Sequence, residues 1–305
     1  MNNLTSLPLV IGLGELLWDC FGDERRPGGA PANVAFQANQ LGCQGAVVTR
    51  VGQDELGTEL LGFLKQQQLS TEFVQIDEAY PTGTVTVEFS DANDPQYTIH
   101  EQVAWDHLQF NDELAELMKQ AQAVCFGTLA QREADSRESI HQCLAATNSD
   151  CLIVYDINLR QKYYDRSWIE RSLTAAKIVK LNQDEVQVLS ELLAISAENL
   201  QAFADHLQQE YGVTAVCITR GAEGCVIYTD DQKYEIPGSP VEVADAVGAG
   251  DAFTAALISR RLLGWPWEQA ALFANRVGGL VASKAGAMPV LRTEFERLSQ
   301  EIQNT

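Results

Sequence analysis

Asp245-Ala246-Val247-Gly248-Ala249-Gly250-Asp251-Ala252-Phe253 is a turn of small residues that leads directly into the apolar segment 254–258. Small side chains at 248–250 let backbone N–H groups converge on the first turn of a helix, where unpaired donors and the positive end of the helix dipole favour an anion. Asp251 lies beside these donors, so its carboxylate can accept a proton from an alcohol. The motif predicts an anion cradle with a general base. The alternative from the same residues is a glycine-rich loop with a helix-capping aspartate.

Outside this motif, short runs of Val, Ile and Leu alternate with longer segments of helical periodicity. That alternation is typical of parallel strands joined by crossover helices, and therefore of the α/β class. No repeat or linker interrupts it, so we expect a single domain over residues 1–305. We expect strands at 8–13, 45–51, 122–127, 151–155, 177–181, 214–219 and 224–229, and helices at 31–41, 55–67, 111–120, 133–146, 183–192, 197–210, 250–263, 267–283 and 292–302.

One part of the chain breaks this rhythm. Residues 82–89 and 97–100 alternate with a period of two, and residues 91–95 between them have the composition of a turn. We interpret them as the hairpin of a small β lid, built mainly from about 15–27 and 72–106. The alternative is an ordinary antiparallel edge of the main sheet.

The composition narrows the choice of partners and compartment. A formal net charge of −21 repels nucleic acids and anionic membrane surfaces. Seven cysteines without a Cys-x-x-Cys pair indicate free thiols in a reducing compartment. The first twenty residues carry no Lys or Arg, and Glu15 and Asp19 interrupt their apolar stretch, which fits neither a signal peptide nor a membrane span. We therefore expect a cytoplasmic protein with no nucleic-acid or membrane partner.

A second tight loop opens a helix near the start of the chain. Gly28 and Gly29 allow a backbone to approach a ligand closely, and Asn33, one turn into the helix, can both donate and accept. Simple turn chemistry is the alternative. Upstream, Leu17 occupies the third glycine position of a dinucleotide fingerprint, so we discount a dehydrogenase. Asp19 is instead interpreted as a carboxylate that binds neighbouring hydroxyls.

Taken together and in order, these motifs resemble the ribokinase-like (PfkB) carbohydrate kinases. The resemblance runs over nearly the whole chain and rests on Gly28-Gly29 with Asn33, Gly52-x-Asp54-x-x-Gly57, Asn182-x-x-Glu185, Thr219-x-Gly221-x-x-Gly224 and residues 245–251. It implies a three-layer sandwich with a central, mostly parallel sheet and a small β lid. It also implies transfer of the γ-phosphoryl group of ATP to a sugar hydroxyl. Lids in this family often pair between subunits, so the resemblance includes a homodimer through the lid.

The resemblance assigns roles residue by residue. It implies an anion hole at Gly248, Ala249 and Gly250, with Asp251 as the catalytic base. Mg²⁺ and the phosphates would be positioned, largely through water, by Asn182 and Glu185, which agrees with the preference of Mg²⁺ for oxygen ligands. The ATP site would be lined by Asn182, Thr219, Gly221, Gly224 and Asn275. A monovalent cation, K⁺, would be held by carbonyls of Asp245, Val247 and Gly286.

The sugar is the least determined part of the prediction. Residues 28–35 look most like fructokinases, and Asp156-x-Asn158-x-Arg160 is shared by fructokinases and ketodeoxygluconate kinases. Arg160 could pair with a substrate carboxylate, support the nucleotide phosphates or lie on the surface. Trp105 could stack on a sugar face or simply pack.

Three functional hypotheses follow from these residues. D-fructose phosphorylated to fructose 6-phosphate is the first, and a kinase of 2-keto-3-deoxygluconate or another sugar acid is the second. The third, from another class, is a non-catalytic sugar-binding regulator, which would be expected to have lost the base or the glycines.

Overall fold

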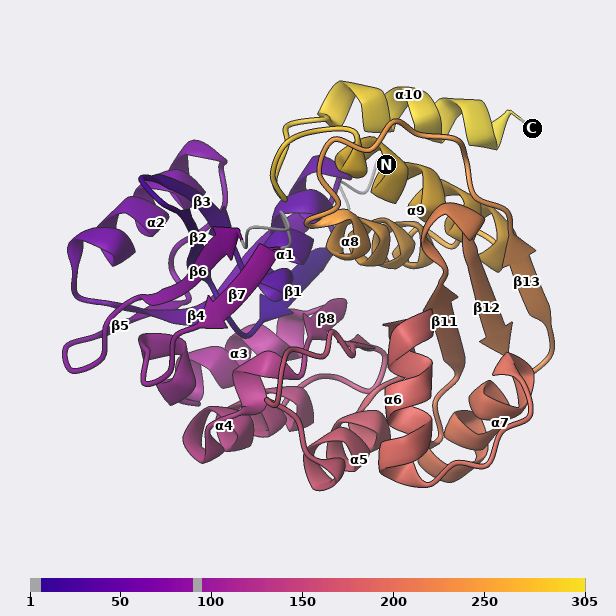
Figure 1. The fold of residues 1–305 in the computed structure, drawn as a ribbon, viewed down its shortest axis with the longest axis horizontal. Helices are drawn as coiled ribbons and strands as arrows, with labels where there is room; N and C mark the ends of the chain where they lie inside the picture. Colours follow the sequence, from indigo (N-terminus) through magenta and orange to yellow (C-terminus); the bar gives the residue numbers. More distant parts are fainter. Residues whose placement is uncertain (1–6, 90–94, 305) are drawn as a thin grey trace, which may run out of the picture.

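The centre of the computed structural model, which describes residues 7–89 and 95–304, is a nine-stranded sheet (Figure 1). Its order is β13-β12-β11-β10-β9-β8-β1-β4-β5, and β12 is the one strand of this sheet that runs opposite to the others. The strands are β1 (Leu9–Leu13), β4 (Gln44–Gly52), β5 (Val74–Asp77), β8 (Ala123–Phe126), β9 (Leu152–Asp156), β10 (Ile178–Asn182), β11 (Ala215–Thr219), β12 (Cys225–Thr229) and β13 (Lys233–Ile236).

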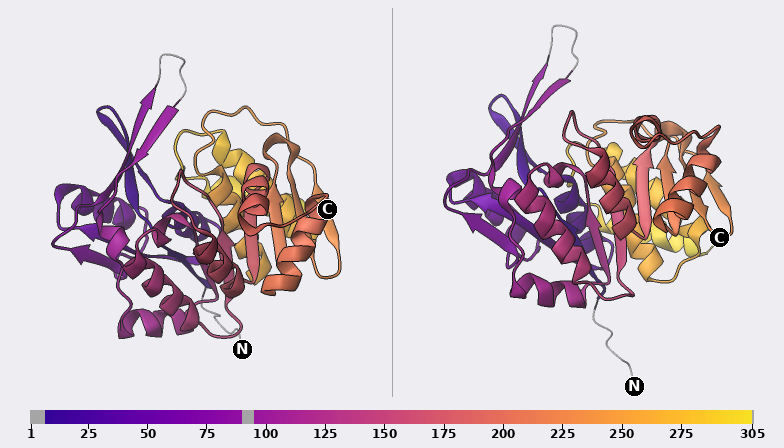
Figure 2. Two further views of the ribbon diagram at one scale, coloured as in Figure 1. Left: turned by 60° about the horizontal axis from the view of Figure 1, so that its bottom comes forward. Right: turned by 90° about the horizontal axis from the view of Figure 1, so that it is seen from below.

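Helices cover both faces of this sheet (Figures 1 and 2). Successive residues of a strand point to opposite faces, so Ile11 packs with one helical layer and Val10 with the other. The first layer contains α3 (Asp112–Gln120), α4 (Ala134–Ala145), α5 (Arg166–Ala175), α6 (Gln183–Leu193) and α7 (Leu200–Tyr211). The second contains α1 (Ala30–Gln40), α8 (Ala249–Leu262), α9 (Trp267–Ala282) and α10 (Arg292–Gln303), and α2 (Glu55–Gln66) packs beside α1 and β4.

A second, four-stranded sheet stands beside the first, with the order β3-β2-β6-β7. Its strands are β2 (Leu17–Phe21), β3 (Glu24–Gly28), β6 (Gly83–Phe89) and β7 (Pro95–Ile99). Strand β2 pairs antiparallel with β3 and parallel with β6, which joins the two distant segments of the expected lid. The β6–β7 hairpin projects away from the body in Figure 2. Of its expected turn, residues 91–94 lie outside the described residues and Pro95 begins β7.

The expected strands and helices are all present, and the largest shift of an end is at α7, expected from 197 and observed from Leu200. Three elements of the large sheet and its helical layers were not expected: β5, β13 and α5. Strands β2 and β3 fall almost entirely within the expected lid segment 15–27, which had not been divided into strands. Strand β5 pairs with β4, so this part of segment 72–106 belongs to the large sheet. The strands of the second sheet within that segment are β6 and β7.

Trp105 belongs to the core. It lies in the 3₁₀ turn Ala104–His107 with only 1% of its surface exposed. The guanidinium of Arg132 lies 4.1 Å from its ring centroid, and that guanidinium in turn pairs with Asp106 at 2.7 Å. Trp105 therefore packs, and the stacking interpretation is wrong.

The cysteines are unpaired, as their spacing predicts. All seven cysteines are free, and six of them are buried. Within residues 7–89 and 95–304, no helix combines the length and the apolarity that crossing a bilayer requires.

Candidate active site

The turn before α8 has the geometry of an anion site. Gly248 is the N-cap with φ +77°, and a Cβ there would lie 2.6 Å from Cα of Ala287, so the position requires glycine. Gly250 and Asp251 follow in the first turn of α8, where backbone N–H groups have no acceptor within the helix. Among the described residues no acceptor binds the N–H groups of Gly250 and Asp251, whereas the N–H of Ala249, also expected in the anion hole, donates to the carbonyl of Ala246 at 3.3 Å.

Asp251 lies partly buried beside this turn and contacts the second loop. The Nδ2 of Asn33 in α1 donates to the Oδ2 of Asp251 at 2.7 Å, which joins residues 218 positions apart. Burial raises the pKa of Asp251 to about 6, reinforced by the charge of Asp156, while the Asn33 hydrogen bond and the charges of Lys180 and Arg160 oppose this rise. At neutral pH the carboxylate is still mostly ionised and can accept a proton.

Close contacts leave no room for a side chain at either glycine of the second loop, Gly28 or Gly29. A Cβ on Gly28 would lie 2.4 Å from an oxygen of Asp19, and one on Gly29 would lie 2.4 Å from the carbonyl oxygen of Glu15. Gly29 has φ +110°, a conformation that favours glycine. Burial raises the pKa of Asp19 to about 6, and the charge of Arg160 opposes this rise. The structure thus gathers Asp19, both glycines and Asn33 on the side of Asp251, within electrostatic range of Arg160.

Two charged residues at this site were not assigned a role from the sequence. Glu15 is only 2% exposed, its Oε1 accepts from the N–H of Ala30 at 3.2 Å, and its Oε2 has no partner among the described residues. Burial raises its pKa to about 7. Lys180 lies in β10 with its Nζ 3.0 Å from Oδ1 of Asp156. In the sequence, each of them stands out only as a single charged residue, Lys180 within an apolar strand and Glu15 just after one.

Asn182 and Glu185 form the start of α6. The N–H of Glu185 donates to Oδ1 of Asn182 at 2.9 Å, and the N–H of Asn182 donates to Oε2 of Glu185 at 2.7 Å. The remaining carboxylate oxygen accepts from Leu159 at 2.8 Å. With both oxygens engaged and Glu185 buried, the pair fits a Mg²⁺ ion bound through water better than one bound directly. The described part of the chain contains no cluster of three or more His, Cys, Asp or Glu side chains suited to a metal.

The residues expected around a nucleotide converge from three segments. Gly224 packs closely on the end of β13 and the segment that follows it, so that a Cβ would lie 2.1 Å from the carbonyl oxygen of Ile236 and 2.6 Å from the nitrogen of Gly238. Asn275 in α9 donates to the carbonyl of Pro237 in that same segment at 3.0 Å. Thr219 ends β11, and Gly221 follows it with φ +56°. Gly278, one turn after Asn275, packs against Ala249 at the start of α8.

The three residues expected around a monovalent cation meet at the side chain of Asp245. Its Oδ1 accepts from the N–H of Val247 at 3.0 Å, and its Oδ2 accepts from the N–H of Gly286 at 3.0 Å. The guanidinium of Arg26 in β3 also contacts that Oδ2 at 3.3 Å. A lid strand is thereby tied to the loop that precedes the anion turn.

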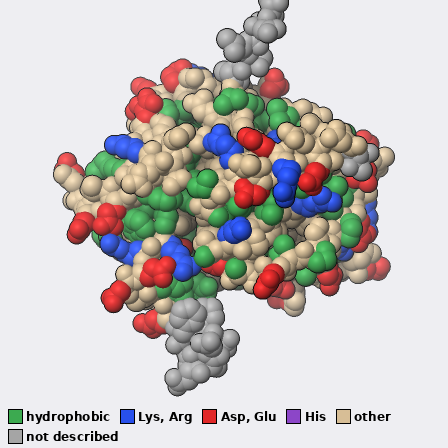
Figure 3. All heavy atoms as spheres, turned by 90° about the horizontal axis from the view of Figure 1, so that it is seen from above, with side chains coloured by type: hydrophobic (Ala, Val, Ile, Leu, Met, Phe, Trp, Pro, Cys, Tyr) green, Lys and Arg blue, Asp and Glu red, His purple; other side chains and the backbone are tan. Residues whose placement is uncertain are grey.

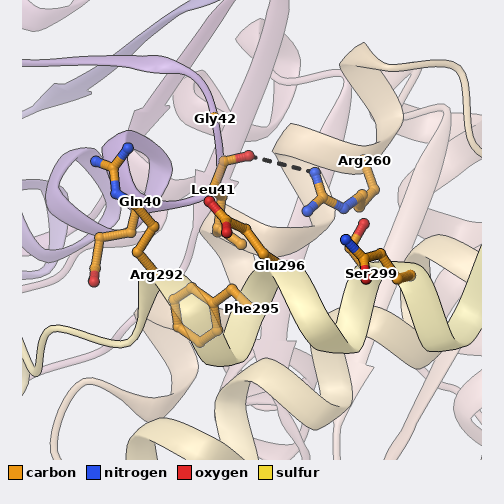
Figure 4. Close-up of a pocket in the computed structure, with 9 residues that line it drawn as sticks. Gln40, Leu41, Gly42, Arg260, Arg292, Phe295, Glu296 and Ser299 are labelled. Carbon is orange, nitrogen blue, oxygen red and sulfur yellow. Dashed lines mark hydrogen bonds between the residues drawn. The ribbon is translucent and has the colours of Figure 1, made fainter.

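Two surface hollows lie away from this cluster and contain none of its residues. One, of about 240 Å³, lies between α10 and the end of α1, where Arg260 donates to the carbonyl of Leu41 (Figure 4). That contact satisfies a carbonyl at the C-terminus of α1, where a cation is favourable. The other, of about 510 Å³, lies beside β12 and β13.

The face of the molecule shown in Figure 3 is not uniformly acidic, although the net charge of the chain is −21. On the face shown in Figure 3, basic side chains are interspersed among acidic and apolar ones. An anionic ligand must therefore be held by local donors such as the turn at 248–250 rather than by the field of the whole molecule.

Comparison with known proteins gives a consistent result. Residues 8–294 match the model of the pfkB family of carbohydrate kinases. The chain is 30% identical over 305 residues to an uncharacterized sugar kinase, PH1459, of Pyrococcus horikoshii, with 94% of each chain covered. It is 29% identical over 288 residues to fructokinase-1 of Oryza sativa subsp. japonica, covering 90% of this chain and 88% of that protein.

Solved structures show the same architecture. The complex of PH1459 with ATP has a TM-score of 0.84 at 27% identity, covering 96% of this chain and 99% of that one. Fructokinase from Xylella fastidiosa with bound ATP also has a TM-score of 0.84, at 22% identity, covering 97% and 99%. The expected ribokinase-like fold is confirmed.

Proposed function

Because this chain belongs to the pfkB family of carbohydrate kinases, phosphotransferases whose acceptor is an alcohol, we propose that it transfers the γ-phosphoryl group of ATP to D-fructose and forms fructose 6-phosphate. The observation that carries this proposal is the contact between Asn33 and Asp251 at the first turn of α8. It brings a side chain suited to sugar hydroxyls, a base and the free helix donors to one point. ATP as co-substrate is supported by the ATP complex of PH1459.

The chemistry follows from how these groups are arranged. Asn33 and Asp19 orient the sugar so that one hydroxyl faces Asp251, which accepts its proton as the hydroxyl oxygen attacks the γ-phosphorus. The N–H groups of Gly250 and Asp251 donate to the phosphoryl oxygens and stabilise their charge as the bond to ADP breaks. Mg²⁺, when bound with the phosphates, would neutralise part of their charge, with Asn182 and Glu185 holding its water shell.

A coupled assay of ADP release with a panel of sugars tests the proposal directly. We expect turnover with D-fructose in preference to ribose or other neutral sugars. If none of the sugars causes release of ADP, the result would support the non-catalytic regulator instead, although the base and the glycines are both present.

Asp251→Asn is the matched test of the base, because the amide keeps the shape and loses the proton affinity. We expect binding of ATP to persist while kcat falls by several orders of magnitude, on the order of 10²–10⁴-fold or more. Isothermal titration with ATP and a turnover assay measure the two effects separately. Near-normal kcat would contradict the assignment of Asp251 as base.

Arg160 supports the second candidate, a kinase of 2-keto-3-deoxygluconate or another sugar acid. The residue is exposed, its guanidinium donates to the carbonyl of Leu159 at 3.2 Å, and no carboxylate among the described residues forms an ion pair with it. It is therefore free to bind a substrate carboxylate. If Arg160→Ala raises KM for a sugar acid while fructose is never turned over by the wild type, the second candidate replaces the first.

Three further assignments belong to this proposal. We place the enzyme in the cytoplasm, since its seven thiols are all unpaired. We assign K⁺ to the carbonyls of Asp245, Val247 and Gly286, to be tested by replacing K⁺ with a larger organic cation in the assay. We assign a homodimer to the lid sheet, whose edges β3 and β7 can pair with a second copy, to be tested by sedimentation.

A further inference from the structure

A lysine lies directly behind the anion turn. Lys180 is in the central strand β10 and is 7% exposed, whereas its neighbours Val179 and Leu181 are fully buried apolar residues. A Cβ on Gly250 would lie 3.0 Å from the Nζ of Lys180, so the ammonium is in contact with the first turn of α8. The only side-chain partner of this ammonium among the described residues is Asp156, at 3.0 Å.

Asp156 ties the ammonium to the helix that carries the base. It ends β9, its Oδ1 contacts Lys180, and its Oδ2 accepts from Oγ1 of Thr254 at 2.9 Å. Thr254 lies in α8, three residues after Asp251. The pair therefore connects β9, β10 and the first turn of α8 in one buried polar cluster.

Burying the Lys180–Asp156 pair removes both charges from water, which costs free energy. A buried ion pair is often no more stabilising than apolar residues of the same volume, so stability does not by itself explain it. Burial alone would lower the pKa of Lys180, but Asp156, Glu185 and Asp251 raise it, so the ammonium stays charged. The structure keeps a permanent positive charge behind the turn where a phosphoryl group would bind.

Charged and titratable groups face Asp251 from every element around it. They are Glu15 after β1, Asp19 in β2, Cys125 in β8, Asp156 in β9, Lys180 in β10 and Arg160 in the loop after β9. Of the two cations in this group, Arg160 is exposed and Lys180 is buried. Solvent therefore screens the charge of Lys180 less than that of Arg160.

We propose that Lys180 and Asp156 are positioning residues of the phosphoryl-transfer site, in which the ammonium of Lys180, held by Asp156, balances the negative charge of Asp251 and of the phosphoryl group at the 248–250 turn. This inference rests on the proposed kinase function. It assigns opposite effects to the two partners: Lys180 keeps Asp251 ionised, and Asp156 works against ionisation.

The test compares Lys180→Met with Asp156→Asn. The pH profile of kcat/KM for the sugar reports the ionisation of the base. We expect the acidic limb to move to higher pH in Lys180→Met and to lower pH in Asp156→Asn, each by on the order of one pH unit. Carbon-13 NMR titration of the Asp251 carboxyl, identified by its loss in Asp251→Asn, measures the same shifts even in a variant that does not turn over.

One control separates this role from a structural one. Lys177→Met removes a lysine just before the same strand, whose Nζ donates to the carbonyl of Ser149 rather than to the cluster. It should not move the acidic limb. Shifts of Lys180→Met and Asp156→Asn in the same direction, or none by NMR, would overturn the inference. If the wild type releases no ADP with any sugar, the kinase proposal fails by itself, and the NMR titration still decides whether the pair controls Asp251.

Discussion

At the scale of single residues, Glu15 makes the stability of the protein depend on pH. Its pKa is about 7 in the folded chain against an ordinary value of 4.5, because the carboxyl is buried. The folded state therefore keeps a proton that the unfolded chain releases between these values, and stability falls as pH rises through that window. Relative to Glu15→Gln, we expect the wild type to gain on the order of 3 kcal/mol in free energy of unfolding from pH 8 to pH 5.

Urea unfolding of the wild type and of Glu15→Gln at pH 5 and pH 8 measures this difference. Groups that titrate equally in both proteins contribute equally to both free energies of unfolding, so their contributions cancel. A difference that stays constant with pH would contradict the raised pKa.

Local sequence patterns predict some residues of the candidate site and miss others. Asn33 and Asp251 lie in short motifs with glycine neighbours, and local turn chemistry was enough to single them out. Lys180 and Glu15 matter because of what surrounds them: one lies 24 residues from its carboxylate partner, and the other is buried by a loop 15 residues away. Burial and long-range charge are properties of the folded chain, and no local pattern of residue types contains them.

At the scale of elements, the start of α8 depends on the backbone of Gly248. Gly248→Ala adds a Cβ at φ +77° and places it 2.6 Å from Ala287, so the turn must shift. We expect a loss of on the order of 1–3 kcal/mol in free energy of unfolding, together with a fall in kcat as the donors move.

Gly212→Ala is the matched control, because Gly212 also has a positive φ of +73° but no atom lies within 4 Å of the added Cβ. It shares the backbone strain and should leave kcat unchanged. Equal losses of kcat in both variants would mean that general destabilisation, rather than the turn, is responsible.

The elements that were not expected are short or weakly patterned. Strands β5 and β13 have four residues each and lie at the two edges of the sheet, where a strand is paired on one side only. Helix α5 buries only Ile169, Ser172 and Leu173, so its apolar stripe is too sparse to stand out. The parallel strands were found because burial on both faces makes them continuous apolar runs.

At the scale of the whole molecule, Arg26 joins the lid to the body through Asp245. Both side chains are partly exposed, so Arg26→Gln should change the free energy of unfolding by less than about 1 kcal/mol. We nevertheless expect KM for the sugar to rise severalfold, because the lid strand loses its tie to the loop before the anion turn. Arg25→Gln is the control: Arg25 pairs with Glu59 at 3.1 Å and leaves this tie intact. Steady-state kinetics showing equal KM values for the two variants would contradict a role of the tie in sugar binding.

The distribution of the thiols has a practical consequence for following lid movement. Six of the seven cysteines are enclosed in the body, and Cys20 alone is partly accessible, in the lid strand β2 opposite Arg25. A maleimide fluorophore should therefore attach at one position without removal of any native cysteine. Its emission, recorded while sugar and nucleotide are mixed in, would report whether the sheet that contains β2 moves when they bind.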